Sequence, residues 1–402
     1  MNIVVFIENN QNGGLNTFCA TLINQWPDPE DSFVVICNKS HPGRKNLEHE
    51  IDTPCKFIYH NIPLSWVMSK KVLSFFPSIL QRASQPFLRM VFFPIQYFWI
   101  RKTLKQNTGD ELLVMNGGFP GGESCRIANI AWANMGRKLG VHNFHNFAVS
   151  PRFGFGWYEN WLDRLLLKSV KSFVSVSHAC AASLQVRSSF KDTIQAKCIY
   201  NGIKDNSAEE NTLNIRDSLN IGDRPLCIML GNYEPRKGHR FIFEVFREVA
   251  KELPEAHLVV CGGGTESQFA RVESIKEQLL PEGNIHLLGF VPKGSSLINQ
   301  ADVLLIGSQE FESFGLTAVE AMIRSKPIVS TNTGGLPEVL GSDDSCGYVV
   351  DRENMVEFAE RTISLLKDKE LRQSMGESGR VRAKKLFNAD RMVQEYLNIV
   401  KK

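Results

Sequence analysis

The chain has 402 residues, which is too long for one small core, and its length alone indicates two or three domains. Hydrophobic residues at 43% and charged residues at 22% are ordinary for a soluble globular protein, and a net charge of +3 does not indicate a nucleic-acid partner. The nine cysteines are scattered without CxxC spacing, so the sequence favours reduced thiols in a cytosolic protein over a zinc site or a disulfide framework.

The first 26 residues predict a strand, a loop and a helix. Residues 2–7 form a short apolar run, and Gly13 and Gly14 mark the loop that follows. No basic segment precedes the run and Glu8 ends it, so we expect a first strand and not a signal peptide. The helix is predicted from apolar residues at helical spacing: Leu15, Phe18, Leu22 and Trp26.

The segment from Thr53 to Gly109 has no acidic residue and is rich in aromatic residues. Its densest part, residues 87–102, is too short and too interrupted by Arg89, Pro94 and Gln96 to span a bilayer. Two interpretations of residues 62–105 remain open. One is an amphipathic segment lying in an anionic membrane surface, and the other is a pair of domain-covering helices whose charges face water.

Strands alternating with helices continue along both halves of the chain and predict mainly parallel sheets covered on both faces. The loop Asn116–Cys125 is rich in glycine and either shapes a binding site or is only a flexible turn. Residues 204–214 are polar and acidic, which is typical of a linker. A second α/β series follows, and a final helix is predicted at 389–402 with one apolar face: Val393, Tyr396, Leu397 and Val400.

Two segments of the second half combine charged side chains with the start of a helix. In the segment ESFGLTAVEAM, Glu312 lies in a loop and Glu320 about a turn and a half into the predicted helix. The free N–H groups at a helix start attract an anion such as phosphate. A ligand with an anionic centre and hydroxyl-bearing ends fits both acids and the helix start, and a nucleotide sugar is such a ligand. On spacing alone, the two acids could also form a solvated helix face.

The segment EPRKG places Arg236 and Lys237 in a loop between a predicted strand and helix. Two cations at the carboxyl end of a parallel sheet are well placed to hold a diphosphate and to stabilise charge on a leaving phosphate. The alternative is a pair of solvated surface cations.

These motifs, together with KPIVSTNTGGLPEVL at 326–340, resemble retaining glycosyltransferases of glycosyltransferase family four (glycosyl transferases group 1). The resemblance covers nearly the whole chain and is most specific from Arg236 to Glu338. It implies the α/β GT-B fold, with two Rossmann-like doubly wound domains facing a cleft. The implied domains are an acceptor-side domain, 1–203 with a returning helix at 388–402, and a donor domain, 204–387.

The resemblance also implies roles for particular residues. Glu320 would bind the donor ribose, Glu312 the hydroxyls of the donor sugar near the reacting centre, and Arg236 with Lys237 the diphosphate. His145 would face the sugar, although His142 lies three residues earlier and is the alternative. The remaining donor-binding positions are Phe314, Gly315 and Leu316 through their backbones, Thr317 near the phosphate, Phe290 and Val291 beside the base, and Gly14 near the phosphate and acceptor.

The implied reaction moves a hexose from a UDP- or GDP-linked sugar, as substrate, to a saccharide or lipid-linked saccharide, with retention of anomeric configuration. We expect no metal and no cofactor, and a place in cell-envelope polysaccharide, lipopolysaccharide or glycolipid synthesis. The location is expected to be cytoplasmic, with peripheral association with the inner membrane face as an option. The competing hypotheses are a GT-B nucleotide-sugar epimerase and a non-catalytic sugar-nucleotide-binding protein.

Overall fold

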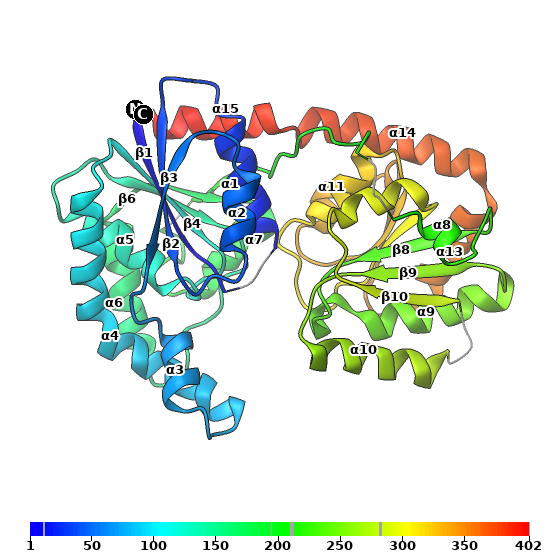
Figure 1. Ribbon diagram of the computed structural model, residues 1–402, viewed down its shortest axis with the longest axis horizontal. Coiled ribbons are helices and arrows are strands. Elements are labelled where there is room, and N and C mark those ends of the chain that lie inside the picture. The colour runs from blue at the N-terminus through cyan, green and yellow to red at the C-terminus, as the bar shows by residue number, and fades with distance from the viewer. Residues whose placement is uncertain (11–12, 194, 210–212, 281–283, 402) are drawn as a thin grey trace. The chain divides into compact units, whose positions relative to one another are not determined.

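The computed structural model describes residues 1–10, 13–193, 195–209, 213–280 and 284–401, and the chain forms two compact units (Figure 1). Unit 1 combines Met1–Gly202 with Ala389–Lys402, and unit 2 is Ile203–Asn388. Each unit is built around one parallel β-sheet.

The sheet of unit 1 has seven strands in the order β3-β2-β1-β4-β5-β6-β7, and every neighbouring pair is parallel. Buried apolar runs such as Ile3–Ile7 suit parallel strands that are covered on both faces. The strands are β1 (Asn2–Glu8), β2 (Ser32–Asn38), β3 (Cys55–His60), β4 (Glu111–Asn116), β5 (Gly140–Phe144), β6 (Val170–Ser175) and β7 (Lys197–Cys198).

The helices of unit 1 include one that comes from the distant C-terminal part of the sequence. They are α1 (Gly14–Asn24), α2 (Arg44–Glu50), α3 (Ser65–Val72), α4 (Ser78–Gln106), α5 (Glu123–Ala133), α6 (Gly156–Leu167), α7 (His178–Ser183), the 3₁₀ turn η1 (Leu184–Val186) and α15 (Ala389–Val400).

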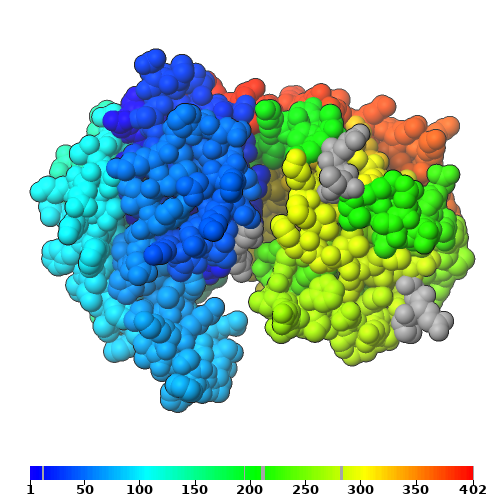
Figure 2. Space-filling view, in the orientation of Figure 1, coloured from blue at the N-terminus to red at the C-terminus, as the bar shows by residue number. Residues whose placement is uncertain are grey.

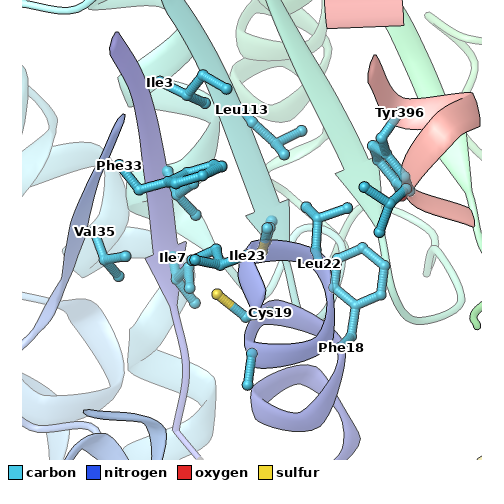
Figure 3. Close-up of a cluster of buried hydrophobic side chains, with 14 of the residues drawn as sticks. Ile3, Ile7, Phe18, Cys19, Leu22, Ile23, Phe33, Val35, Leu113 and Tyr396 are labelled. Carbon is cyan, nitrogen blue, oxygen red and sulfur yellow. The ribbon is translucent and has the colours of Figure 1, made fainter. Parts of the chain in front are cut away.

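Strand β1 divides its side chains between two hydrophobic cores on opposite faces of the sheet. Ile3 and Ile7 join the core under α1 and α15, whereas Val4 and Phe6 join the core under α4 and α5. Figure 3 shows the first core, in which residues of β1, β2, β4, α1 and α15 converge. The ring of Tyr396 lies 5.6 Å from that of Phe18, so the last helix completes the covering of this face.

The segment at 62–105 forms α3 and α4, and α4 continues through Pro86 and Pro94. Its inner face contributes Ile100 and Leu104 to the second core, and this packing holds the helix in spite of the two prolines. Among the residues that the structure describes, no helix combines the length and apolar character needed to cross a bilayer.

The sheet of unit 2 has six parallel strands in the order β10-β9-β8-β11-β12-β13. The chain begins at the centre, extends the sheet on one side, and then crosses β8 to extend it on the other. This is the Rossmann order, in which ligands bind beyond the carboxyl ends of the two central strands, here β8 and β11. The strands are β8 (Leu226–Leu230), β9 (His257–Cys261), β10 (Ile285–Gly289), β11 (Val303–Ile306), β12 (Ile328–Thr331) and β13 (Gly347–Val350).

Helices cover both faces of the second sheet (Figure 1). Its main core gathers apolar side chains of the strands with those of α9, α10 and α13. The helical elements are α8 (Ile215–Ser218), the 3₁₀ turns η2 (Pro235–Lys237) and η3 (Gly294–Gln300), α9 (His239–Glu252), α10 (Glu266–Leu279), α11 (Leu316–Ile323), α12 (Leu336–Leu340), α13 (Met355–Lys367) and α14 (Lys369–Leu386).

Candidate functional site

The loops that follow the two central strands of unit 2 meet through an ion pair. Lys237, after β8, donates from Nζ to Oε2 of Glu312, after β11, at 2.6 Å. Ser308 donates to the same oxygen at 3.2 Å. Burial of the Glu312 carboxyl alone would raise its pKa. The Lys237 charge and these hydrogen bonds lower the pKa by more than burial raises it, so the pKa lies below its ordinary value. Glu312 is therefore a carboxylate at neutral pH.

Arg236 lies in the same loop as Lys237 but has other partners. Its Nε donates to Glu234 Oε2 at 2.6 Å, and its guanidinium lies 5.0 Å from the ring of Phe311. Its backbone oxygen accepts from the N–H of Gln309 at 2.8 Å, which ties the loop after β8 to the loop after β11. The two loops thus bring two cations to the point where the Rossmann topology predicts a ligand.

Helix α11 begins directly after this loop and needs a glycine there. Gly315 has φ +95°, which favours glycine, and a Cβ atom on it would lie 2.6 Å from Leu336 Cδ2. The Phe314 ring is buried 5.5 Å from that of Phe387, so Phe314 presents its backbone and not its ring. The first turn, which includes Leu316 and Thr317, has no acidic side chain. Since the first N–H groups of a helix have no partner within it, this helix start suits an anion.

The loop after β12 supports the backbone of Glu312 from behind. The N–H of Gly335 donates to the Glu312 carbonyl at 2.8 Å. A Cβ atom on Gly334 would lie 2.1 Å from that carbonyl oxygen. Only glycine therefore allows this approach, which gives the TNTGG segment a physical role in positioning the acid.

Glu320 lies on α11 in surroundings that differ from those of Glu312. Burial raises its pKa to about 7, and the charge of Arg324 offsets this only in part. Arg324 uses its guanidinium on backbone oxygens, donating to Glu320 O at 3.0 Å and to Asn206 O at 3.2 Å. The two acids of the motif thus have pKa values shifted in opposite directions, which is common at functional sites.

Phe290 and Val291 follow β10, on the same edge of the sheet as the two loops. Phe290 is 66% exposed. Its Cδ2 lies 3.9 Å from the position that a Cβ atom on Gly263 would take, so its ring stands beside the loop after β9. An exposed ring next to a glycine-rich loop offers a planar surface for an aromatic base.

Unit 1 holds the other two predicted positions. Gly14 is the first residue of α1, in the segment that follows β1. His145 follows β5, and its ring packs 4.1 Å from that of Phe18. Its Nε2 has no hydrogen-bond partner among the described residues, and burial lowers the pKa of its imidazole to about 3, so the ring is neutral.

His142 is the alternative to His145 and has a structural role in β5. Its Nδ1 lies 2.8 Å from the amide of Asn129, and its Nε2 lies 3.3 Å from that of Asn116. Both ring nitrogens are thus occupied inside the sheet. Of the two histidines, only His145 has a ring nitrogen without a partner among the described residues, and that nitrogen is buried in this structure.

Two doubly wound parallel sheets, with a last helix that returns to the first unit, define a protein of the GT-B fold class. Over all of this chain and 99% of the other, the structure is similar to that of Anabaena Alr3699/HepE in complex with UDP and glucose, with a TM-score of 0.76 and 17% identity. Residues 211–382 match the family Glycosyl transferases group 1, so the chain contains a glycosyltransferase group 1 domain.

Two curated relatives match parts of the chain. N-acetyl-alpha-D-glucosaminyl L-malate synthase of Bacillus anthracis is 30% identical over 174 residues, 43% of this chain and 44% of that protein. Poly(glycerol-phosphate) alpha-glucosyltransferase of Bacillus subtilis is 31% identical over 134 residues, 33% of this chain and 20% of that protein. The chain thus matches less than half the length of each.

Three residues near the site were not identified from the sequence. Glu234 pairs with Arg236, Ser308 donates to Glu312, and Arg324 sets the surroundings of Glu320. Glu234 lies inside the EPRKG segment, where an acid two residues before an arginine could have indicated a pair. The other two carry no local signal, because their contacts depend on how strand β11 and helix α11 are placed.

Proposed function

We propose that the protein is a retaining glycosyltransferase that moves a hexose from a nucleoside diphosphate sugar to a saccharide or lipid-linked saccharide. The observation that carries the proposal is the pair of Lys237 and Glu312, which lies beyond the central strands of unit 2 and next to the start of α11. It combines a cation for phosphate, a carboxylate for hydroxyl groups and a helix start in one place.

The donor would bind with its diphosphate over the first turn of α11. Lys237 and Arg236 would turn from Glu312 and Glu234 to the diphosphate, which carries two negative charges where each carboxylate carries one. Glu312 would then accept hydrogen bonds from hydroxyls of the sugar, and Glu320 from those of the ribose. The base would lie beside Phe290 and Val291. Gly14 and Thr317 would lie near the phosphates.

In the transfer step, the bond between the sugar C1 and the phosphate oxygen breaks and a bond to the acceptor oxygen forms. Lys237 and Arg236 stabilise the negative charge that develops on the departing diphosphate. The acceptor attacks from the face that the nucleotide leaves, which retains the configuration, and its proton passes to the departing phosphate oxygen. His145 positions the sugar through its neutral ring.

The acceptor we propose is part of a cell-envelope polysaccharide or glycolipid. The similarity to poly(glycerol-phosphate) alpha-glucosyltransferase and to a protein solved with UDP and glucose supports a sugar donor and a polymeric acceptor. We further propose a cytoplasmic location, at the inner membrane face when the acceptor is lipid-linked.

Nucleotide binding tests the donor site. We would measure the thermal stability of the wild type with UDP, GDP, ADP and NAD, and repeat it with Glu320→Ala and with Glu277→Ala, an exposed acid on α10, as the matched control. A nucleoside diphosphate at a hundred times its dissociation constant should add about 2.7 kcal/mol to the stability. We expect this gain in the wild type and in Glu277→Ala, and its loss in Glu320→Ala. Stabilisation by NAD alone, or by none of the four, would contradict the proposal.

Product analysis separates transfer from the two alternatives. The assay uses a nucleotide sugar that contains the nucleotide found to stabilise the protein. A transferase releases free nucleoside diphosphate and forms a glycosidic product. NMR then assigns the product as α- or β-linked. An epimerase would return a changed sugar, with no saccharide product. A binding protein would return the donor unchanged. Inversion of configuration would contradict the retaining mechanism but not the assignment as a glycosyltransferase.

A further inference from the structure

The outer face of α4 carries a stripe of exposed apolar side chains. They recur at helical spacing along one side of the helix: Leu80, Phe87, Val91, Ile95 and Phe98. The opposite side of the same helix packs into the core through Ile100 and Leu104. The corner between α3 and α4, which projects from the rest of unit 1 (Figures 1 and 2), adds Phe75 with 98% exposure. Because the inner side of α4 packs into the core, the stripe is left on the surface of unit 1.

Helix α6 packs against the other side of α4, the side that faces the core, and exposes two aromatic residues of its own. Trp157 is 66% exposed, and Trp161 lies edge-on to Phe93 of α4 at 5.2 Å. The hydroxyl of Tyr158 donates to the backbone oxygen of Arg89 at 3.2 Å, so the two helices are fixed side by side. We call the surface formed by the stripe and by Phe75 at the α3–α4 corner the aromatic face.

Every exposed charged side chain on these segments is a cation. Residues 62–106 and 151–168 are all described, and their exposed charges are Lys70, Lys71, Arg82, Arg101, Lys102, Lys105, Arg152, Arg164 and Lys168. The acids of α6 lie inside the unit. Glu159 and Asp163 are buried, and both pair with the fully buried Arg126 and Arg187.

We propose that the aromatic face lies in the headgroup region of an anionic lipid membrane. Exposed aromatic rings enter the interface between headgroups and acyl chains, and lysine and arginine attract anionic lipids at the same depth. A second copy of this chain would suit the face less, because like cations would meet across a symmetric contact. The proposal goes beyond sugar transfer, since it concerns a surface of unit 1 that needs neither donor nor acceptor.

Vesicle binding tests the proposal directly. The full chain would be sedimented with vesicles of phosphatidylglycerol and phosphatidylcholine in equal parts, and with vesicles of phosphatidylcholine alone. Each would be tested at low salt and at about 0.5 M salt, where surface charges are screened. We expect binding to the anionic vesicles at low salt, at least tenfold weaker binding to the neutral ones, and release of much of the protein by salt.

Two variants separate the apolar and the charged contributions. Phe75→Ser/Phe98→Ser removes rings that are 98% and 67% exposed, so the fold should be kept, and we expect at least tenfold weaker binding. Lys102→Glu/Lys105→Glu should remove most of the preference for anionic vesicles. The matched control is Val356→Ser/Lys369→Glu, an exposed apolar residue and an exposed cation of unit 2, which should bind as the wild type does.

Three results would overturn the proposal. The wild type could remain in solution with both kinds of vesicle, or the Phe75→Ser/Phe98→Ser variant could bind as well as the wild type. The third result is that sedimentation velocity shows a dimer for the wild type and a monomer for the same variant, while neither binds vesicles. This result would assign the face to self-association. None of these assays contains a sugar donor, so their failure is distinct from failure of the proposed function.

Discussion

Glu312 and Glu320 lie eight residues apart, yet the pKa values of their carboxyl groups are shifted in opposite directions. Glu312 has Lys237 within hydrogen-bond distance and a pKa below its ordinary value. Glu320 is shielded from water by burial, which the charge of Arg324 offsets only in part, and has a pKa of about 7. A carboxyl group that titrates near neutral pH makes both the stability of the empty protein and its affinity for hydroxyl groups depend on pH.

The Glu320→Gln variant should reveal this titration. The folded protein keeps the Glu320 proton up to about pH 7, whereas the unfolded chain loses it near pH 4.5. Rising pH therefore destabilises the wild type between these values, by up to about 3 kcal/mol, and does not affect the amide. We expect the stability of Glu320→Gln relative to the wild type to rise from pH 4.5 to pH 7 and then level off. Urea unfolding across this range measures it, and a difference that does not vary with pH would contradict the assignment.

The Lys237–Glu312 pair should show coupling in a double-mutant cycle. Lys237→Met leaves a partly buried carboxylate without its cation, which should destabilise the protein by about 1–3 kcal/mol. Adding Glu312→Gln removes the unpaired charge, so the double variant should recover most of this loss. Chemical denaturation of the two single variants and the double variant gives the coupling energy. Strict additivity of the two single effects would show that the pair does not act as a unit.

The sequence identified the acids and cations of this site, but not how they pair. The spacing from Glu312 to Glu320 and the adjacent Arg236 and Lys237 were readable because local elements position them. That Lys237 pairs with Glu312 depends on the distance between two loops that are about 75 residues apart in sequence, whereas the pair of Arg236 with Glu234 is local. The roles of His145 and Gly14 stay predictions, although the contacts of His142 favour His145.

At the scale of elements, the start of α11 depends on one backbone conformation. Gly315→Ala would force a side chain into φ +95° and place a Cβ atom 2.6 Å from Leu336 Cδ2. We expect a loss of about 1–3 kcal/mol in stability and weaker nucleotide binding, because the first turn of α11 would shift. The control is Gly156→Ala at the first residue of α6, where a Cβ atom would have no heavy atom within 4 Å. If both variants unfold at the wild-type temperature, this account of the α11 start is wrong.

The strands were predictable because parallel strands buried on both faces read as short apolar runs, as Ile3–Ile7 does. The length of α4 was not predictable. Pro86 and Pro94 each remove a helical hydrogen bond, and local rules would end the helix there. Packing of Ile100 and Leu104 against the sheet maintains it, and such long-range packing leaves no mark on the local sequence.

At the scale of the whole molecule, the six tryptophans provide a probe of one unit. All of them lie in the part of the sequence that forms unit 1: Trp26, Trp66, Trp99, Trp132, Trp157 and Trp161. Tryptophan fluorescence therefore reports on unit 1. It can be used to test the role of helix α15, the returning helix predicted from the sequence, in closing the core of unit 1.

Tyr396 of α15 gives that test. Its side chain is fully buried beside Phe18, and its hydroxyl has no hydrogen-bond partner among the described residues. Tyr396→Ala should destabilise unit 1 by about 3–5 kcal/mol, because it leaves a cavity in the core. Tyr396→Phe removes only the unpaired hydroxyl and should be neutral or stabilising by about 1 kcal/mol. Unfolding followed by tryptophan fluorescence measures both, and equal destabilisation by the two variants would contradict this assignment of α15.

The return of α15 to unit 1 also orders events during synthesis on the ribosome. Residues 203–388 are contiguous, so unit 2 has its whole sequence available before α15 is made. Unit 1 must wait for residues 389–400, and until then the core drawn in Figure 3 lacks Met392, Val393 and Tyr396. The segment translated first therefore completes its core last, and in the interval its apolar surface is a natural target for chaperones.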